Sequence, residues 1–276
     1  MIGHGPDKTK TPPSAEITVL GRATPSHTMI ATKQQRTVLK DIWTDSPEYR
    51  RNYQTDDDIE AILGCLGLST ASGLVDVGCG NWAFSVAAAE RYPACRVWAF
   101  DALESAVSEC CAKAGDLLHA NLSVATAWAH SIPLGDASAD RALFRSVLHH
   151  LAEPQLVYTE IGRLLKPAGL LVLQSPCNYW ESSFARVLGE VMLLMDETHR
   201  RFFYRPAEIV AGLQGAGFSV GEPECWTYSF PFLDDRQAQL IRDHQAQERL
   251  HLRQIEAGKW SIENYWVRVV ATRKDA

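Results

Sequence analysis

The sequence contains no apolar run long enough to cross a bilayer, which argues against a helical membrane protein. Residues 1–13 are polar and lack the apolar core of a signal peptide, so we expect a cytoplasmic protein. Basic residues are not in excess either: 27 Lys and Arg stand against 33 Asp and Glu, a net charge of −6. Nucleic-acid binding usually needs a basic face, so we expect no nucleic-acid partner and no membrane partner.

Closely spaced cysteine pairs of the Cys-x-x-Cys type are also missing. The seven cysteines are scattered along the chain, which argues against a disulfide framework and a zinc cage, and we expect no bound metal. Most of them are expected to be small buried residues. Cys79 differs from the others because it lies inside a glycine turn.

That turn is the most informative segment that is present. Three apolar residues and an acid, Leu74-Val75-Asp76-Val77, lead directly into Gly78-Cys79-Gly80, and an alanine-rich helical pattern follows over 84–91. This order predicts a buried strand, a tight turn and a helix N-terminus. Glycine lets a ligand approach the backbone, and the helix end offers free N–H groups. We therefore predict a cradle for a nucleotide-type ligand.

The pattern after residue 74 alternates between strands and helices, which predicts a parallel sheet with helices on both faces. We expect an α/β fold: a Rossmann-like, doubly wound, mostly parallel seven-stranded sheet, with N-terminal helices over 33–66 and a break near Ser46-Pro47. Helices are expected over 48–66, 102–114, 155–165 and 207–215. Strands are expected over 74–77, 96–100, 121–127, 140–144, 170–174, 218–225 and 260–271.

We expect residues 1–30 to form a flexible tail and residues 31–276 to form one domain with an N-terminal helical cap. The apolar-rich segment 178–205 follows the fifth strand, where ligands bind in open α/β sheets, and is interpreted as a lid insertion or a core helix. The charged segment 234–256 is expected to be a helix. It forms either a solvated face or a homodimer contact.

The glycine turn alone leaves the ligand open. Residues 78–83 satisfy the dinucleotide pattern G-x-G-x-x-G/A, which is a weak signal by itself. Asp101, at the end of the second predicted strand, suits a ribose in a dinucleotide site and equally in an S-adenosylmethionine site. Other segments must discriminate between the two ligands.

Six such segments occur in a fixed order along the chain: Val75-Asp76-Val77-Gly78-Cys79-Gly80, Phe100-Asp101, Ile132-Pro133-Leu134 with Ala139-Asp140-Arg141-Ala142, Leu148-His149-His150-Leu151, Leu165-Lys166-Pro167-Ala168-Gly169 and Gly215-Ala216-Gly217-Phe218. Over residues 50–225 the chain thereby resembles the class I S-adenosylmethionine-dependent methyltransferases. The similarity is to the group that contains the ubiquinone-biosynthesis type and many small-molecule methyltransferases. It implies that S-adenosylmethionine is the cofactor and a small molecule the substrate.

The resemblance also implies roles for residues of the cofactor site. Asp76 organises the turn and approaches the methionine amino group, while Gly78, Cys79 and Gly80 pass close to the cofactor. Asp101, followed by Ala102, accepts both ribose hydroxyls, since a carboxylate is acceptor-only; the alternative for Asp101 is a helix N-cap.

The chain departs from the family pattern at two places. Trp82 stands where a third glycine is usual, so it either turns away from the methionine moiety or narrows its pocket. Trp128, Ala129 and His130 stand where the family often has an acid near adenine. We expect Trp128 to stack on adenine and His130 to contact its edge.

The acceptor side is predicted from the segments that follow the fourth and fifth strands. Arg145 is expected to pair with a carboxylate of the cofactor or the substrate, or to form a surface ion pair. His149 is the preferred general base, with His199 and Tyr204 as further catalytic candidates. Each also has a purely structural interpretation.

Three alternatives to small-molecule methylation stay open. The altered pocket around Trp82 and Trp128 would suit a non-methylating use of the cofactor, such as a cyclisation. A non-catalytic S-adenosylmethionine-binding partner protein is the second, and a nicotinamide-dependent dehydrogenase is the weakest.

Overall fold

The computed structural model describes residues 54–68, 73–80, 82–108, 120–178, 204–248 and 250–275. The strands in this part of the chain are β1 (Gly73–Val77), β2 (Arg96–Asp101), β3 (Leu122–Thr126), β4 (Ala139–Arg145), β5 (Leu165–Cys177), β6 (Phe218–Val220), β7 (Glu224–Leu233), β8 (Arg253–Glu256) and β9 (Lys259–Arg273). The helices are α3 (Asp56–Leu66), α4 (Ala83–Arg91), the 3-10 turn η1 (Leu148–His150), α6 (Pro154–Leu164), α8 (Pro206–Gly215) and α9 (Asp235–Asp243).

Seven strands form the main sheet in the order β3-β2-β1-β4-β5-β9-β6. Strands β1 to β5 are parallel to one another, whereas β9 is antiparallel to β5. The strand order reverses between β1 and β4. In open α/β sheets, ligands bind outside the carboxyl ends of the strands at this switch point. The predicted Rossmann-like, mostly parallel architecture is therefore confirmed.

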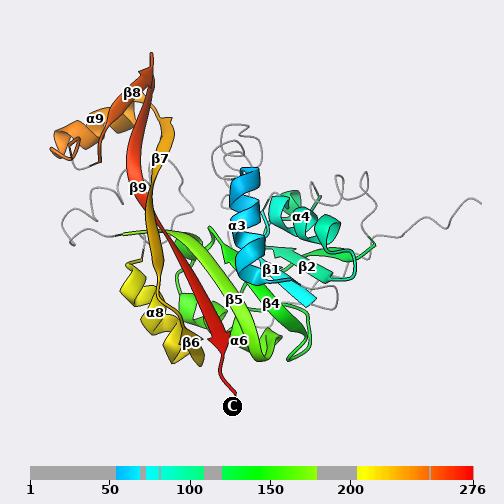
Figure 1. The fold of residues 1–276 in the computed structure, drawn as a ribbon. Helices are drawn as coiled ribbons and strands as arrows, with labels where there is room; N and C mark the ends of the chain where they lie inside the picture. Colours follow the sequence, from blue (N-terminus) through cyan, green and yellow to red (C-terminus); the bar gives the residue numbers. More distant parts are fainter. Residues whose placement is uncertain are drawn as a thin grey trace, which may run out of the picture.

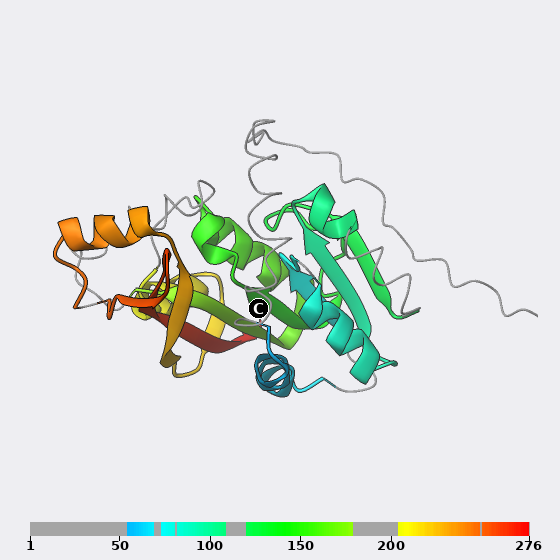
Figure 2. The ribbon, with the colours of Figure 1, turned by 90° about the horizontal axis from the view of Figure 1, so that it is seen from above.

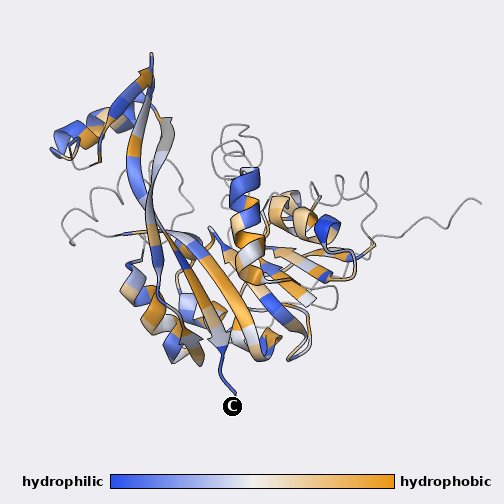
Figure 3. Ribbon diagram, viewed as in Figure 1, coloured by the Kyte–Doolittle hydropathy of each residue, from blue (hydrophilic) through white to orange (hydrophobic). Residues whose placement is uncertain are grey.

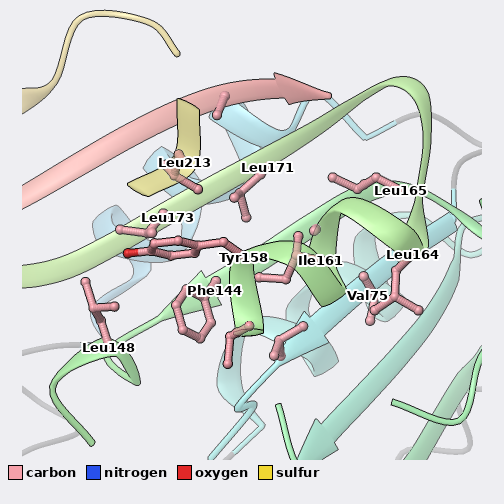
Figure 4. Packing of buried hydrophobic residues seen from close by; sticks show 14 of the residues in the cluster. Val75, Phe144, Leu148, Tyr158, Ile161, Leu164, Leu165, Leu171, Leu173 and Leu213 are labelled. Atoms are coloured by element: carbon pink, nitrogen blue, oxygen red, sulfur yellow. The ribbon is translucent and has the colours of Figure 1, made fainter. Parts of the chain in front are cut away.

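Helices cover both faces of the sheet (Figures 1 and 2). Helices α3 and α4 pack on one face, through a cluster that contains Ile62 and Val172. Helices α6 and α8 pack on the other, where Tyr158 lies beside Leu173 and Phe144 (Figure 4). Hydrophobic residues accordingly concentrate on the central strands (Figure 3). This double-sided burial explains why the parallel strands read as continuous apolar runs.

Strands β7 and β8 extend the main sheet beyond the prediction. They pair with β9 on its two edges, at Trp226↔Trp266 for β7 and Gln254↔Trp260 for β8. With α9 they form an extension that rises above the carboxyl end of the parallel sheet (Figure 1). The sheet of the described residues therefore has nine strands and not seven.

The helix predicted over 234–256 is wrong in length. Helix α9 covers only Asp235–Asp243; Gln245 then adopts φ 54°, and the chain turns before it forms β8. The strand β8 pairs with β9 across a turn at Gly258, which has φ 73°. The charged segment after Asp243 has no strong local preference for helix or strand, so its pairing with β9 decides that it forms a strand. The prediction of a homodimer through this segment stays a prediction.

Three other boundaries also differ. The strand predicted over 218–225 is divided into β6 and β7, because the chain around Pro223 leaves the ladder. The helix predicted over 48–66 begins only at Asp56, since Thr55 is extended and caps it. The strand predicted over 170–174 begins earlier, at Leu165, with a register irregularity against β4.

Several predicted segments lie outside the described residues: the tail 1–30, the first N-terminal helix, residues 109–114 of the helix predicted over 102–114, and the lid apart from residues 178, 204 and 205. In the part of the chain that is described, no helix combines the length and apolar character needed to span a bilayer.

Candidate functional site

The glycine turn joins β1 to α4 at the switch point. The N–H groups of Gly78 and Cys79 both donate to the carbonyl of Phe100 on β2, at 2.7 and 2.9 Å. Gly78 has φ 77°, and a Cβ there would lie 2.2 Å from Cγ2 of Val147. Gly80 has φ 52°, but no atom lies within 4 Å of the position that a Cβ would take there. The turn is thus packed on the Gly78 side and has free space at Gly80.

Asp101 ends β2 directly beside this turn. Its Oδ2 accepts the N–H of Gly80 at 2.9 Å and its Oδ1 accepts the N–H of Leu103 at 2.9 Å. Burial raises the pKa of this carboxyl group, while the backbone N–H groups of Leu103, Gly80 and Ala102 act in the opposite direction. A carboxylate has about four acceptor positions, so each oxygen retains capacity for a ribose hydroxyl. The capping bond and the predicted ribose role are therefore compatible.

Asp76 lies on β1, two residues before the turn, and is almost fully buried. Its Oδ2 accepts the hydroxyl of Ser85 on α4 at 2.5 Å. Burial is the main reason that the pKa of Asp76 is raised to about 7. The hydrogen bond from Ser85 lowers this pKa, the negative charge of Asp101 raises it, and the positive charge of Arg145 lowers it. A group with this pKa changes its charge in the physiological range, and an ammonium placed beside it would favour the ionised form.

Trp82 precedes α4 in a left-handed conformation, with φ 71°. Its indole packs against the hydrophobic cluster under α3 and α4. This cluster also contains Cys79 of the glycine turn, so the contact leaves open both options that the sequence offered for Trp82. A left-handed tryptophan is strained, and such residues persist where surrounding packing holds them.

The segment after β3 lies on the same edge of the sheet as Asp101. The N–H of Ala127 donates to the carbonyl of Asp101 at 2.9 Å, and Trp128 and His130 follow with ring centroids 6.3 Å apart. Trp128 is 37% exposed, and Ala129 packs against the core. Their location suits the adenine end of the site, and the stacking contact stays a prediction.

Arg145 ends β4 and is only 8% exposed. Its guanidinium lies between two aromatic rings, 4.6 Å from the centroid of Phe84 and 5.1 Å from that of Trp266. Because Arg145 also lowers the pKa of Asp76, its charge acts on the cofactor turn. The predicted alternative of an ordinary surface ion pair does not fit this burial.

The structure describes two of the three catalytic candidates, His149 and Tyr204. His149 lies in η1 after β4, is buried, and has its ring centroid 4.1 Å from that of His150. Tyr204 is buried in the cluster under α6 and α8, and its carbonyl accepts the N–H of Asn178 at 3.0 Å. His199 lies outside the described residues. Their catalytic roles stay predictions.

Several residues of the site were not predicted: Ser85 and Phe84 on α4, Gln174 on β5, and Trp266 and Arg268 on β9. The period-two alternation of β9 was available as a signal, because it places residues 264, 266 and 268 on one face. The sequence carried no signal for which residues lie beside them on neighbouring strands, since those residues come from distant parts of the chain. No group of three or more His, Cys, Asp or Glu in the described ranges is arranged to hold a metal ion.

The glycine turn, Asp101 at the end of β2 and the switch point define a Rossmann-like enzyme with a nucleotide-type cofactor. A family profile described as "Methyltransferase domain" matches residues 75–173. Residues 75–173, which contain the glycine turn and Asp101, are accordingly a methyltransferase domain, and S-adenosylmethionine is the cofactor of such a domain. The free space at Gly80 and the acceptor capacity of Asp101 fit this cofactor.

Solved structures with the same fold include two proteins described as methyltransferases and one described as a cyclase. A putative methyltransferase from Bacillus halodurans C-125 has a TM-score of 0.71 and 20% identity, covering 79% of this chain and 100% of that one. Haemonchus contortus phosphoethanolamine N-methyltransferase 2, in complex with S-adenosyl-L-methionine, has a TM-score of 0.59 and 15% identity, covering 88% of this chain and 59% of that one. The [4+2]-cyclase SpnF has a TM-score of 0.59 and 18% identity, covering 80% of this chain and 81% of that one. No curated protein sequence matches the chain significantly.

Proposed function

We propose that this methyltransferase acts on a small-molecule acceptor with a carbon, nitrogen or oxygen nucleophile. The observation that carries the proposal is the burial of Arg145 and His149, which are 8% and 4% exposed at the carboxyl end of β4. A small molecule can reach such groups by entering the site. The surface of a folded protein or a nucleic-acid duplex would reach them only with large rearrangement.

The bound cofactor supplies a methyl group that its sulfonium already activates. The protein then has to hold the acceptor in line with that methyl group, and such positioning alone supplies several kcal/mol. A base is needed where the acceptor is a hydroxyl, an acidic C–H group or a protonated amine. We propose His149 for this role because it is buried and follows β4 directly; His199 and Tyr204 are the alternatives.

The test is transfer of a labelled methyl group. The purified chain is incubated with methyl-labelled S-adenosylmethionine and, separately, with the small-molecule, protein and nucleic-acid fractions of a cell extract. We expect label only in the small-molecule fraction, and His149→Ala should reduce that transfer. Label confined to protein or nucleic acid would overturn the proposal.

The cofactor site has its own test in Asp101→Ala. Removing the carboxylate also removes two charge-assisted hydrogen bonds to the turn, so we expect affinity for S-adenosylhomocysteine to fall at least tenfold. Asp140→Ala is the matched control. Asp140 also accepts a backbone N–H, that of Gly73 at 2.9 Å, but at the other end of the parallel strands. The control should lower stability and leave the affinity, measured by calorimetry, unchanged.

A non-methylating reaction is the second candidate, supported by the structural similarity to the cyclase SpnF. The two candidates differ in their products. Methylation releases one S-adenosylhomocysteine for each acceptor consumed, whereas a cyclisation consumes substrate and releases no S-adenosylhomocysteine. Quantifying S-adenosylhomocysteine against substrate loss separates them.

A further inference from the structure

A row of polar residues runs across four strands at the carboxyl end of β4. The register places Arg145 beside Gln174, Gln174 beside Arg268, and Arg268 beside Glu224. Arg268 donates to Gln174 at 3.1 Å and to Glu224 at 3.2 Å. This row continues sideways from the cofactor site to the extension.

Aromatic residues form the next rows on the same face, farther out along β7 and β9. Trp226 and Trp266 are a direct cross-strand pair with nearly parallel rings, 6.5 Å between centroids and 11° between planes. Tyr228 meets Trp266 edge-on at 5.3 Å. We call Trp226, Tyr228 and Trp266 the aromatic ladder. Trp226 and Tyr228 are only partly buried, whereas Trp266 is buried.

The aromatic ladder is continuous with the cofactor site through Arg145. The guanidinium of Arg145 contacts Phe84 on one side and Trp266 on the other, and its charge reaches Asp76. The guanidinium of Arg268 lies 5.1 Å from the ring of Trp226 and is held by the polar row. Both indoles of the ladder therefore have a fixed orientation relative to the site.

A buried amide lies at the far end of the ladder. Asn264 is fully buried on β9, opposite Tyr228, and its Oδ1 accepts the N–H of Tyr265 at 2.8 Å. Its Nδ2 has no hydrogen-bond partner among the described residues. Leaving a buried donor unpaired is unfavourable, and such groups in folded proteins call for a functional explanation. An oxygen atom of a bound molecule would satisfy it.

We propose that the aromatic ladder is the acceptor subsite and that it takes a planar aromatic molecule with an oxygen substituent. The ring stacks on the indole of Trp226, and the oxygen accepts the Nδ2–H of Asn264. Aromatic pairs are stabilised by offset or edge-on contact beyond simple burial, which a saturated ring of the same size cannot reproduce. The inference rests on the proposed small-molecule acceptor and specifies its chemical class.

The experiment compares two probes of equal charge and carbon skeleton, 2-naphthoate and decahydro-2-naphthoate. Their dissociation constants are measured by calorimetry on the full chain saturated with S-adenosylhomocysteine. We expect the planar probe to bind about tenfold more tightly. Trp226→Leu should remove this preference, and Asn264→Leu should weaken both probes through the lost donor.

Trp260→Leu is the matched control. Trp260 is also a β9 indole, but it lies at the tip of the extension, where it donates to Asp235 at 2.7 Å and contacts Arg242. This variant should retain the preference for the planar probe. Melting curves in the presence of S-adenosylhomocysteine establish that each variant is folded.

Three results would each overturn the proposed aromatic subsite. The two probes bind with equal affinity, neither probe binds measurably, or Trp226→Leu retains the preference for the planar probe. Failure of the proposed function appears separately, in the labelled-fraction assay. Transfer to a small molecule together with equal probe affinities would retain the proposed function and reject only the aromatic class.

Discussion

At the residue scale, Asp76 connects the cofactor site to pH. Its pKa is about 7 in the folded protein and close to the ordinary value of 3.8 in the unfolded chain, chiefly because burial disfavours the charged form. An acid whose pKa is raised on folding binds its proton more tightly in the native state. Its contribution to stability is therefore full below about pH 4 and is lost as the pH rises through about 7.

We accordingly expect the cofactor-free protein to lose on the order of 4 kcal/mol of stability over this interval through Asp76. The measurement is the free energy of unfolding by urea at several pH values, for the wild type and Asp76→Asn. Asp101 contributes in the same direction, so the difference between the two proteins isolates Asp76. Parallel profiles would contradict the prediction.

The two turn glycines provide a second prediction at this scale. Gly78→Ala places a Cβ 2.2 Å from Val147 in a left-handed conformation, so it combines a clash with strain. Gly80→Ala adds a Cβ to free space, and only strain of about 1–2 kcal/mol remains. We expect Gly78→Ala to be the more destabilising variant in urea unfolding, and Gly80→Ala to lose chiefly cofactor affinity. Equal stability losses would contradict this.

At the scale of the element, α3 depends on its N-cap. The side chain of Thr55 accepts the N–H of Asp58 at 3.2 Å, and the carboxylate of Asp58 accepts the N–H of Thr55 at 3.3 Å. Thr55→Ala removes one half of this capping box, and we expect a loss of about 1 kcal/mol in urea unfolding. Thr55→Ser retains the hydroxyl and should be close to the wild type. A neutral Thr55→Ala would mean that packing alone holds α3.

At the scale of the whole molecule, cofactor binding and folding are linked. A ligand that binds only the native state stabilises it by about 2.7 kcal/mol when present at 100 times its dissociation constant. We expect S-adenosylhomocysteine to raise the melting temperature and NADH to leave it unchanged, as measured by scanning calorimetry. A shift with NADH alone would favour the dinucleotide interpretation of the glycine turn.

The central strands were predictable because their signals are local. The segments 74–77 and 96–100 are short and mainly apolar and are followed by a glycine and an acid, respectively. Strands β1 and β2 agree closely with them. The segment 234–256 carries no comparable signal. Its helix ends at Asp243, and β8 forms only because β9 offers it an edge.

The sequence by itself determined the glycine turn, which depends on residues adjacent in the chain. It also determined the parallel sheet and the class of cofactor, which depend on the order of such local segments along the chain. Only the tertiary structure decided which side chains meet beyond the turn. Arg145 lies between Phe84 and Trp266, although these residues come from α4, β4 and β9. The physical reason is strand register: a shift by one residue would turn Trp266 to the opposite face, and nothing local in the sequence sets that register.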